Sequence, residues 1–253
     1  MTTVLTPSIV LSTMRYGETS KIARLATRDL GIQSAIAKGA SRPRSRFGAA
    51  LHLFSEGVAH IIPARRSDLH TLAAFELVAL RVGLAARMDR FATASLLAEI
   101  MLQFAPAAAH EASFDLLRDA LATLEIAPEA AIEPLGLRML WQLVSVLGFE
   151  PALHRCAHDG TVLPPDTPLR FSGADGGLLC RSCSMGHQGP SLAPADQADL
   201  RALASPEAEL PALDDRHLAA HRRLFSRYLQ YHLGEGRALP ALAFWEQRSW
   251  VTG

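Results

Sequence analysis

Along roughly the first 75 residues, apolar and polar positions tend to alternate in short runs that glycine residues separate. Alternation with a period of two is typical of strands with one buried face, and glycine suits the turns between them. Five short strands at this spacing predict a small β-barrel of the OB type that ends near Ala74. The strands are expected at residues 8–14, 20–27, 31–38, 51–63 and 69–75.

The pattern changes near Glu76, beyond which apolar residues recur every three or four positions, the period of an amphipathic helix. One helix is expected to begin with Pro134 in its first turn, a position that suits proline, and to stop near Gly148. The other helices are expected at residues 77–104, interrupted around Asp89, and at residues 113–124, 196–203 and 215–233, the last ending at Gly234.

Residues 150–190 fit neither pattern, since they are rich in proline and glycine and contain all three cysteines. We expect this segment to be a loop inserted between helices. The predicted fold class is therefore α+β. An OB-type barrel in residues 1–76 is followed by a mainly helical domain in residues 77–253, with a cysteine-bearing, zinc-finger-like insert at about residues 150–190.

The charge is distributed unevenly. The 253 residues carry 25 basic and 25 acidic side chains, and this net charge of zero argues by itself against a strongly basic nucleic-acid binder. However, ten of the basic but only four of the acidic residues precede residue 75, so this end carries about +6 and the rest about −6. Such an asymmetry is a hint of a face that binds a polyanion, but from charge alone a basic surface that is only solvated is an equal alternative.

The densest basic stretch runs from Lys38 to Arg46 and alternates cations with glycine, proline and serine, so it cannot lie in a core. A loop of this kind presents guanidinium groups to phosphates, and its binding would be independent of sequence and sensitive to salt. Cations on the neighbouring strands could converge on the same groove. The predicted nucleic-acid-binding residues are Lys21, Arg24, Arg28, Lys38, Arg42, Arg44, Arg46, Arg65 and Arg66.

Aromatic side chains that could stack on bases are scarce in this region, with Tyr16, Phe47 and Phe54 as the candidates. Phe47 stands between Arg46 and Gly48, but a phenylalanine in a strand-rich segment more often lies in the core. Electrostatic contact with the nucleic-acid backbone is therefore expected to dominate over stacking.

The cysteines suggest a metal site, because Cys180 and Cys183 form one of the two short hooks that a structural zinc ion requires. The other hook offers Cys156 followed by His158 and Asp159, so the fourth ligand would not be a thiolate. The alternative is an insert that packing holds and that binds no metal; in either case we expect the segment to be structural. The predicted zinc ligands are Cys156, Asp159, Cys180 and Cys183. His158 is an alternative to Asp159 as the fourth ligand, and His154 and His187 are weaker candidates.

The sequence contains no P-loop, dinucleotide-binding glycine motif, nucleophile elbow or plausible pair of catalytic carboxylates. We therefore expect a binding protein, not an enzyme, with no required cofactor apart from the zinc considered above. No apolar run approaches the roughly 20 residues of a membrane helix, and residues 1–12 do not have the pattern of a signal peptide. Both observations favour a cytoplasmic protein that does not bind a membrane.

Residues 16–21 (YGETSK) with 25–31 (LATRDLG), and residues 37–40 (AKGA) with 43–51 (PRSRFGAAL), look like the strands and basic loop of the barrel in one known family. These separated motifs resemble the RecO family of DNA-repair proteins. Residues 147–149 (LGF) before Cys156, and a Gly-Gly pair before residues 180–183 (CRSC), look like its cysteine insert. The zinc-bearing members of the family would have a cysteine where Asp159 stands, and this departure puts the zinc in question.

The resemblance implies a bacterial, nucleoid-associated mediator of DNA repair and homologous recombination of the RecF-pathway type. Such a protein binds single- and double-stranded DNA, anneals complementary strands, and works with RecR to help RecA replace single-strand-binding protein. It also implies that the helical domain docks the apolar, acidic C-terminal tail of single-strand-binding protein. Cations such as Arg222 or Arg227 in a helix-lined groove would suit the acidic residues of that tail.

Two other functions remain open from the residues alone. The chain could be an RNA-binding or translation-associated OB-fold protein with a helical interaction domain, which its substrate preference would distinguish. It could also be a zinc-dependent hydrolase built around the three cysteines, which would require a stoichiometric metal ion exposed to water.

Overall fold

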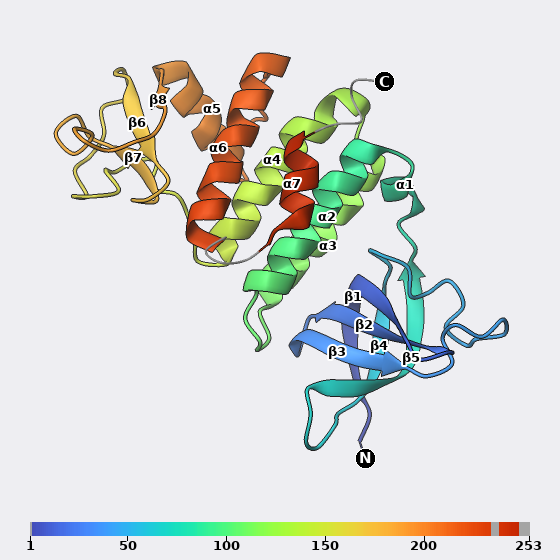
Figure 1. The fold of residues 1–253 in the computed structure, drawn as a ribbon. Helices are drawn as coiled ribbons and strands as arrows, with labels where there is room; N and C mark the ends of the chain where they lie inside the picture. The colour runs from blue at the N-terminus through green and yellow to red at the C-terminus, as the bar shows by residue number, and fades with distance from the viewer. Residues whose placement is uncertain (1, 234–237, 248–253) are drawn as a thin grey trace. The chain divides into compact units, whose positions relative to one another are not determined.

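The computed structural model of the chain describes residues 2–233 and 238–247, and Figure 1 shows their path. By its internal contacts the chain divides into two compact units, Met1–Ala127 and Pro128–Gly253. The first unit contains the barrel together with three helices, and the second contains the remaining helices and a small sheet. A compact unit can hold more than one domain, so the domain boundary expected at residues 76/77 stays a prediction.

Five strands form a closed barrel at the N-terminus, which confirms the OB-type architecture. Their order around the barrel is β1-β2-β3-β5-β4, and all pairs are antiparallel except β3 with β5. The last strand runs beyond the expected end near Ala74, because its pairing with β4 continues until Ala79 lies opposite Glu56. The strands are β1 (Val4–Tyr16), β2 (Ser20–Thr27), β3 (Gly31–Ala37), β4 (Glu56–Ile62) and β5 (Leu69–Ala79).

The barrel core is narrow and contains many alanines, as suits a small five-stranded barrel whose interior must be filled by side chains. The strand expected from residue 51 begins only at Glu56, because residues 51–55 belong to the β3–β4 connection. Leu51 and Phe54 in that connection are apolar because they are buried, at 2% and 4% exposure. Phe54 also has a positive φ of 65°, which a strand does not allow.

The first three helices are α1 (Val82–Ala85), α2 (Met88–Phe104) and α3 (Glu111–Ile126). The single helix expected from residue 77 is wrong at its start, because residues 77–79 still belong to β5. The expected interruption is real and lies at Arg87, whose backbone is extended. The carboxylate of Asp89 accepts hydrogen bonds from the Arg87 side chain (2.9 Å) and the Arg90 N–H (2.8 Å), and so secures the new helix start.

The second unit consists of α4 (Glu129–Val146), a three-stranded sheet, α5 (Pro194–Ala204), α6 (Asp215–Leu233) and α7 (Pro240–Gln247). Pro134 lies inside α4 and not in its first turn, because the helix begins at Glu129. The side chains of Trp141, Phe225 and Tyr228 form the aromatic centre of this unit, with ring centroids of Trp141 4.9 Å and 5.1 Å from the other two. The expected stop of α6 at Gly234 lies outside the described residues.

The cysteine-bearing insert is more ordered than the loop expected for residues 150–190. It contains β6 (Leu169–Ser172), β7 (Gly177–Leu179) and β8 (Ser191–Leu192) in the order β7-β6-β8. Gly177 makes this sheet compact, since a Cβ there would lie 2.3 Å from the Ala152 carbonyl oxygen. The insert is therefore a small sheet with hooks, which agrees with the predicted zinc-finger-like character.

Candidate nucleic-acid interface and cysteine site

The basic loop, residues 38–46, follows β3 and exposes its cations. Lys38, Arg42, Arg44 and Arg46 are all exposed. A series of tight turns holds the backbone, with hydrogen bonds from the Arg42 N–H to the Gly39 carbonyl (3.1 Å) and from the Ser45 N–H to the Arg42 carbonyl (3.0 Å). The next residue, Phe47, is buried at 2% exposure and anchors the loop in the barrel core. Phe47 is therefore a core residue, as the sequence favoured, and not an exposed stacking residue.

The β1–β2 hairpin adds further positive charge beside this loop. The Ser41 N–H donates a 2.9 Å hydrogen bond to the Thr19 carbonyl, which ties the loop to the hairpin turn. On the hairpin, Arg15 lies directly opposite Lys21. Like charges opposite each other destabilise a sheet, so a bound anion would relieve their repulsion. Arg15 was not among the predicted nucleic-acid-binding residues. It directly follows the strand expected at residues 8–14, and this position was a signal that could have identified it.

The exposed ring of Tyr16 is the aromatic group of this edge. Tyr16 ends β1 next to Arg15 and is 51% exposed, whereas Phe47 and Phe54 are buried. The structure therefore leaves one of the three candidate aromatic residues available for stacking on a base. We call Arg15, Tyr16, Lys21 and the basic loop together the cationic edge.

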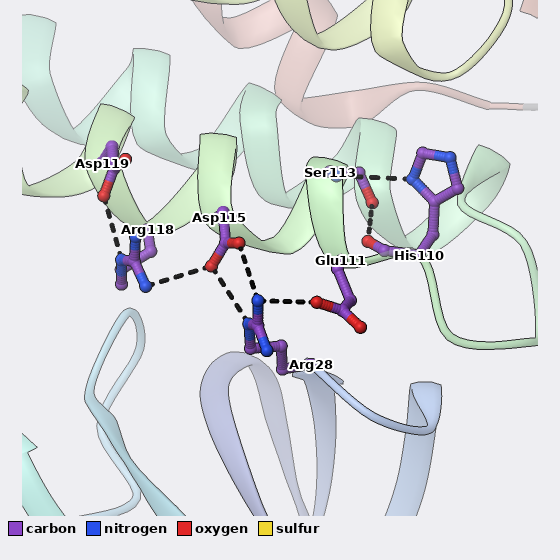
Figure 2. A network of polar contacts seen from close by, with 7 residues as sticks. All are labelled: Arg28, His110, Glu111, Ser113, Asp115, Arg118 and Asp119. Carbon is purple, nitrogen blue, oxygen red and sulfur yellow. Dashed lines mark hydrogen bonds and ion pairs between the residues drawn. The ribbon is translucent and has the colours of Figure 1, made fainter.

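Two of the predicted phosphate contacts, Arg24 and Arg28, make internal contacts instead. Arg24 donates a 3.3 Å hydrogen bond to the Leu102 carbonyl of α2. Arg28 forms ion pairs with Glu111 (2.6 Å) and Asp115 (3.3 Å) of α3, as Figure 2 shows. Hydrogen bonding to Asp115 raises the pKa of the Arg28 guanidinium. These cations fasten the barrel to its neighbouring helices, so the structure does not place them with the cationic edge.

Arg65 and Arg66 are exposed in the β4–β5 connection. They precede Leu69, which lies beside Ser34 in the parallel β3–β5 pair. They therefore lie towards the start of β3, whereas the basic loop follows the end of that strand. The structure does not bring this pair together with the other predicted cations.

The four predicted metal ligands converge, although they come from hooks separated by β6 and β7. Their ligand atoms, the Sγ atoms of Cys156, Cys180 and Cys183 and a carboxylate oxygen of Asp159, all lie within 4.8 Å of one another. Asp159 Oδ2 accepts hydrogen bonds from Cys183 Sγ at 3.2 Å and from Cys180 Sγ at 3.5 Å. The Thr161 N–H holds the other carboxylate oxygen at 2.9 Å.

The protonation states in this cluster follow from these contacts. Hydrogen bonds from the Thr161 N–H and from thiols hold the pKa of Asp159 well below its usual range. The same carboxylate raises the pKa of the Cys183 thiol to about 12, while the Ser182 hydroxyl lowers the pKa of Cys180. Thiols must lose their protons to bind a metal, so metal would compete with protons here. Three thiolates and one carboxylate are a donor set that fits structural zinc.

The alternative fourth ligand, His158, and the weaker candidates His154 and His187 do not join the four-residue cluster. His154 is exposed. His158 and His187 instead lie around the carboxylate of Asp175, which sequence analysis did not single out. Nothing in the spacing of these three residues indicated that they would meet.

Two hollows border α6 on the side of the insert. One, of about 210 Å³, is lined by residues that include Leu192, His221 and Arg223. The other, of about 610 Å³, includes Phe171, Tyr228 and Tyr231, and Arg227 lines both. Arg222, which was expected to line a pocket of this kind, is buried, pairs with Glu133 and lies over the ring of Trp245.

These features define an OB-type barrel protein with a helical second part and a zinc-finger-like insert. Residues 1–81 match the family described as recombination protein O N terminal, and residues 86–240 match recombination protein O C terminal. The chain therefore belongs to the recombination protein O (RecO) family, and this membership supports a role in DNA repair and recombination.

Curated relatives agree over most of the chain. A DNA repair protein RecO from Rubrobacter xylanophilus is 37% identical over 178 residues, which are 69% of each chain. Those from Anaeromyxobacter dehalogenans strain 2CP-C and a Nocardioides species are each 32% identical over 248 residues. The aligned part is 94% of each chain in the first case, and 95% of this chain and 98% of the relative in the second. Within the part that the structure describes, no helix has the length and apolar character to cross a membrane.

Proposed function

We propose that this protein is a non-enzymatic mediator of recombinational DNA repair. It binds single- and double-stranded DNA, anneals complementary strands, and acts with RecR to help RecA replace single-strand-binding protein, in the bacterial cytoplasm at the nucleoid. Family membership supports the general role. The observation that carries the specific proposal is the cationic edge of the barrel, in which an anchored loop with exposed cations is hydrogen-bonded to the hairpin that carries Arg15 and the half-buried Lys21.

The chemistry of this edge suits phosphates more than particular bases. Arg42, Arg44 and Arg46 offer planar guanidinium forks that match phosphate oxygens, and the loop that carries them is held by backbone hydrogen bonds. The exposed ring of Tyr16 could stack on an unpaired base, a contact that tolerates any sequence. Neutralising the phosphates of two strands reduces their mutual repulsion, so complementary strands held at this edge would pair more readily.

The test is the annealing of complementary strands that are coated with single-strand-binding protein, with and without RecR. We expect the full chain to accelerate annealing, and the variant Arg42→Ala/Arg44→Ala/Arg46→Ala to lose most of this activity. The matched control is Arg155→Ala/Arg181→Ala/Arg216→Ala, which removes the same charge from exposed positions in residues 128–253. Equal activity of both variants would remove the edge from the mechanism, and a preference for RNA strands would favour the RNA-binding alternative.

For the tail of single-strand-binding protein, we propose the hollows beside Arg227. Their apolar walls, among them Phe171, Leu224 and Tyr231, suit an apolar peptide, and the exposed cations Arg223 and Arg227 suit its acidic residues. Calorimetry with the tail peptide should show binding that Arg227→Ala weakens and Arg216→Ala does not. Absence of binding to the unaltered chain would overturn this assignment without affecting DNA binding.

We also propose that the cysteine insert is structural. Four side chains converge on its centre, which would close a zinc ion's coordination shell, whereas a hydrolytic zinc needs an open position for water. A zinc ion held there would tie the hook at residues 156–159 to the hook at residues 180–183. This arrangement favours a binding protein over the alternative of a zinc-dependent hydrolase.

A further inference from the structure

A second cluster of metal-binding side chains lies in the insert, apart from the cysteines. His158 comes from the first hook, Asp175 from the turn between β6 and β7, and His187 from the segment before β8. One ligand atom from each residue lies within 4.8 Å of the other two. Three segments that are distant in sequence thus bring two imidazoles and a carboxylate together.

The distances are longer than those of strong hydrogen bonds. His158 Nδ1 lies 3.3 Å from Asp175 Oδ1, and His187 Nε2 lies 3.5 Å from Asp175 Oδ2. Charge-assisted hydrogen bonds of this type are about 2.7–2.9 Å long. In contrast, two ligands of a tetrahedral zinc ion with bonds of about 2.0–2.2 Å are about 3.4 Å apart. The spacing therefore matches that of ligands around a shared ion, with each imidazole next to a different oxygen of Asp175.

The surroundings of Asp175 prepare it for this role. The buried Ser172 hydroxyl donates a hydrogen bond to Asp175 Oδ2, and the Asp175 N–H donates a 3.2 Å hydrogen bond back to Ser172 Oγ. These two bonds hold the carboxylate in one orientation. Such a hydrogen bond from a neighbouring residue is how proteins orient a carboxylate that ligates a metal.

We propose that His158, Asp175 and His187 form a second metal site, for zinc or a similar transition-metal ion, distinct from the cysteine site. Imidazole and carboxylate ligands suit such ions, and three protein ligands leave one coordination position for water or an added carboxylate. Because His187 also lines the 610 Å³ hollow with Ser172 and Arg227, an ion bound here would fix part of that hollow's wall.

Cobalt(II) titration of the metal-free full chain distinguishes the two sites, because cobalt substitutes for zinc and can be followed by its absorption spectrum. Only the cysteine site has thiolate ligands, which give a strong charge-transfer band. We expect one equivalent with this band and a second equivalent without it. Cys180→Ser should weaken the band and keep the second equivalent. Asp175→Asn and His187→Ala should each weaken the second equivalent at least tenfold, whereas the control His154→Ala, in the same insert, should not.

Histidine proton signals give an independent measurement in case Asp175→Asn fails to fold. In the Cys180→Ser chain, one equivalent of zinc should shift the ring signals of His158 and His187 together and leave those of His154 unchanged. Ring signals that do not move, or a second cobalt equivalent that His187→Ala leaves intact, would overturn the proposal and identify the cluster as a hydrogen-bonded group only.

Discussion

Removing the three arginines of the basic loop tests the cationic edge most directly. In Arg42→Ala/Arg44→Ala/Arg46→Ala, three exposed guanidinium groups disappear. The buried anchor Phe47 remains, and so does the backbone hydrogen bond that ties the loop to the β1–β2 hairpin. We therefore expect the variant to fold normally and to lose only its affinity for nucleic acid.

The size of the loss follows from the number of phosphates released. If each arginine contacts one phosphate, the slope of log K against log salt becomes shallower by about 2.7 for duplex DNA and by about 2 for single strands. At about 0.15 M salt, the duplex figure corresponds to roughly hundredfold weaker binding. The loss should be the same for unrelated sequences, because phosphates carry no sequence information.

Fluorescence anisotropy with labelled DNA, at several salt concentrations between about 50 and 200 mM, measures both the affinity and the slope. Two unrelated sequences and both strand forms should be titrated. The control variant, Arg155→Ala/Arg181→Ala/Arg216→Ala, should keep the original slope. If the loop variant kept its slope and affinity, or if the control lost as much, the reasoning that assigns DNA contact to this loop would be refuted.

Three further predictions concern other parts of the chain. Arg28→Ala should lower the urea midpoint of unfolding, because it removes the ion pairs with α3; the effect should be smaller at high salt, because these pairs are partly exposed. The salt slope of DNA binding should stay unchanged, and a shallower slope would show that Arg28 contacts DNA. Cys180→Ser should release zinc and lower the melting temperature while DNA binding persists, as elemental analysis and thermal unfolding would show; loss of strand annealing at full stability would contradict a structural role. Burial lowers the pKa of His221, so the unfolded chain takes up a proton more readily than the folded chain, and stability should fall as the pH drops below about 6.5. In His221→Gln this fall should be smaller, and identical pH profiles of unfolding for both chains would refute the prediction.

The barrel could be predicted from sequence because its pattern is local. The limits of β2 were predicted correctly, since its alternating run lies between turns at Gly17 and Gly31. The start of β4 was not, because Leu51 and Phe54 are apolar for a different reason: from the connection before β4, Leu51 packs into the barrel core and Phe54 packs against Phe91 of α2. A period-two pattern cannot distinguish an apolar residue in a strand from one that anchors a connection.

The site could be predicted only in part, because charge in a sequence does not show its partner. Arg28 and Asp115 are 87 residues apart, and the pairing becomes evident only when α3 lies against the barrel. The zinc hooks were easier, since each hook is a short motif, and the structure brings all four predicted ligands together. The cluster around Asp175 has no such motif, because each of its three residues comes from a separate turn.

The different surroundings of Lys21 and Arg28 make the charges at the two ends of β2 electrically independent of each other. Lys21 lies near the hairpin end of the strand, whereas Arg28 follows its other end and is neutralised by α3. Seven residues of extended chain separate them by about 23 Å. Physiological salt screens charges over about 8 Å. A change in α3 that alters the neutralisation of Arg28 therefore has almost no effect on the electrostatic potential at Lys21. Selection can adjust the contacts between the barrel and α3 without changing the potential at the cationic edge.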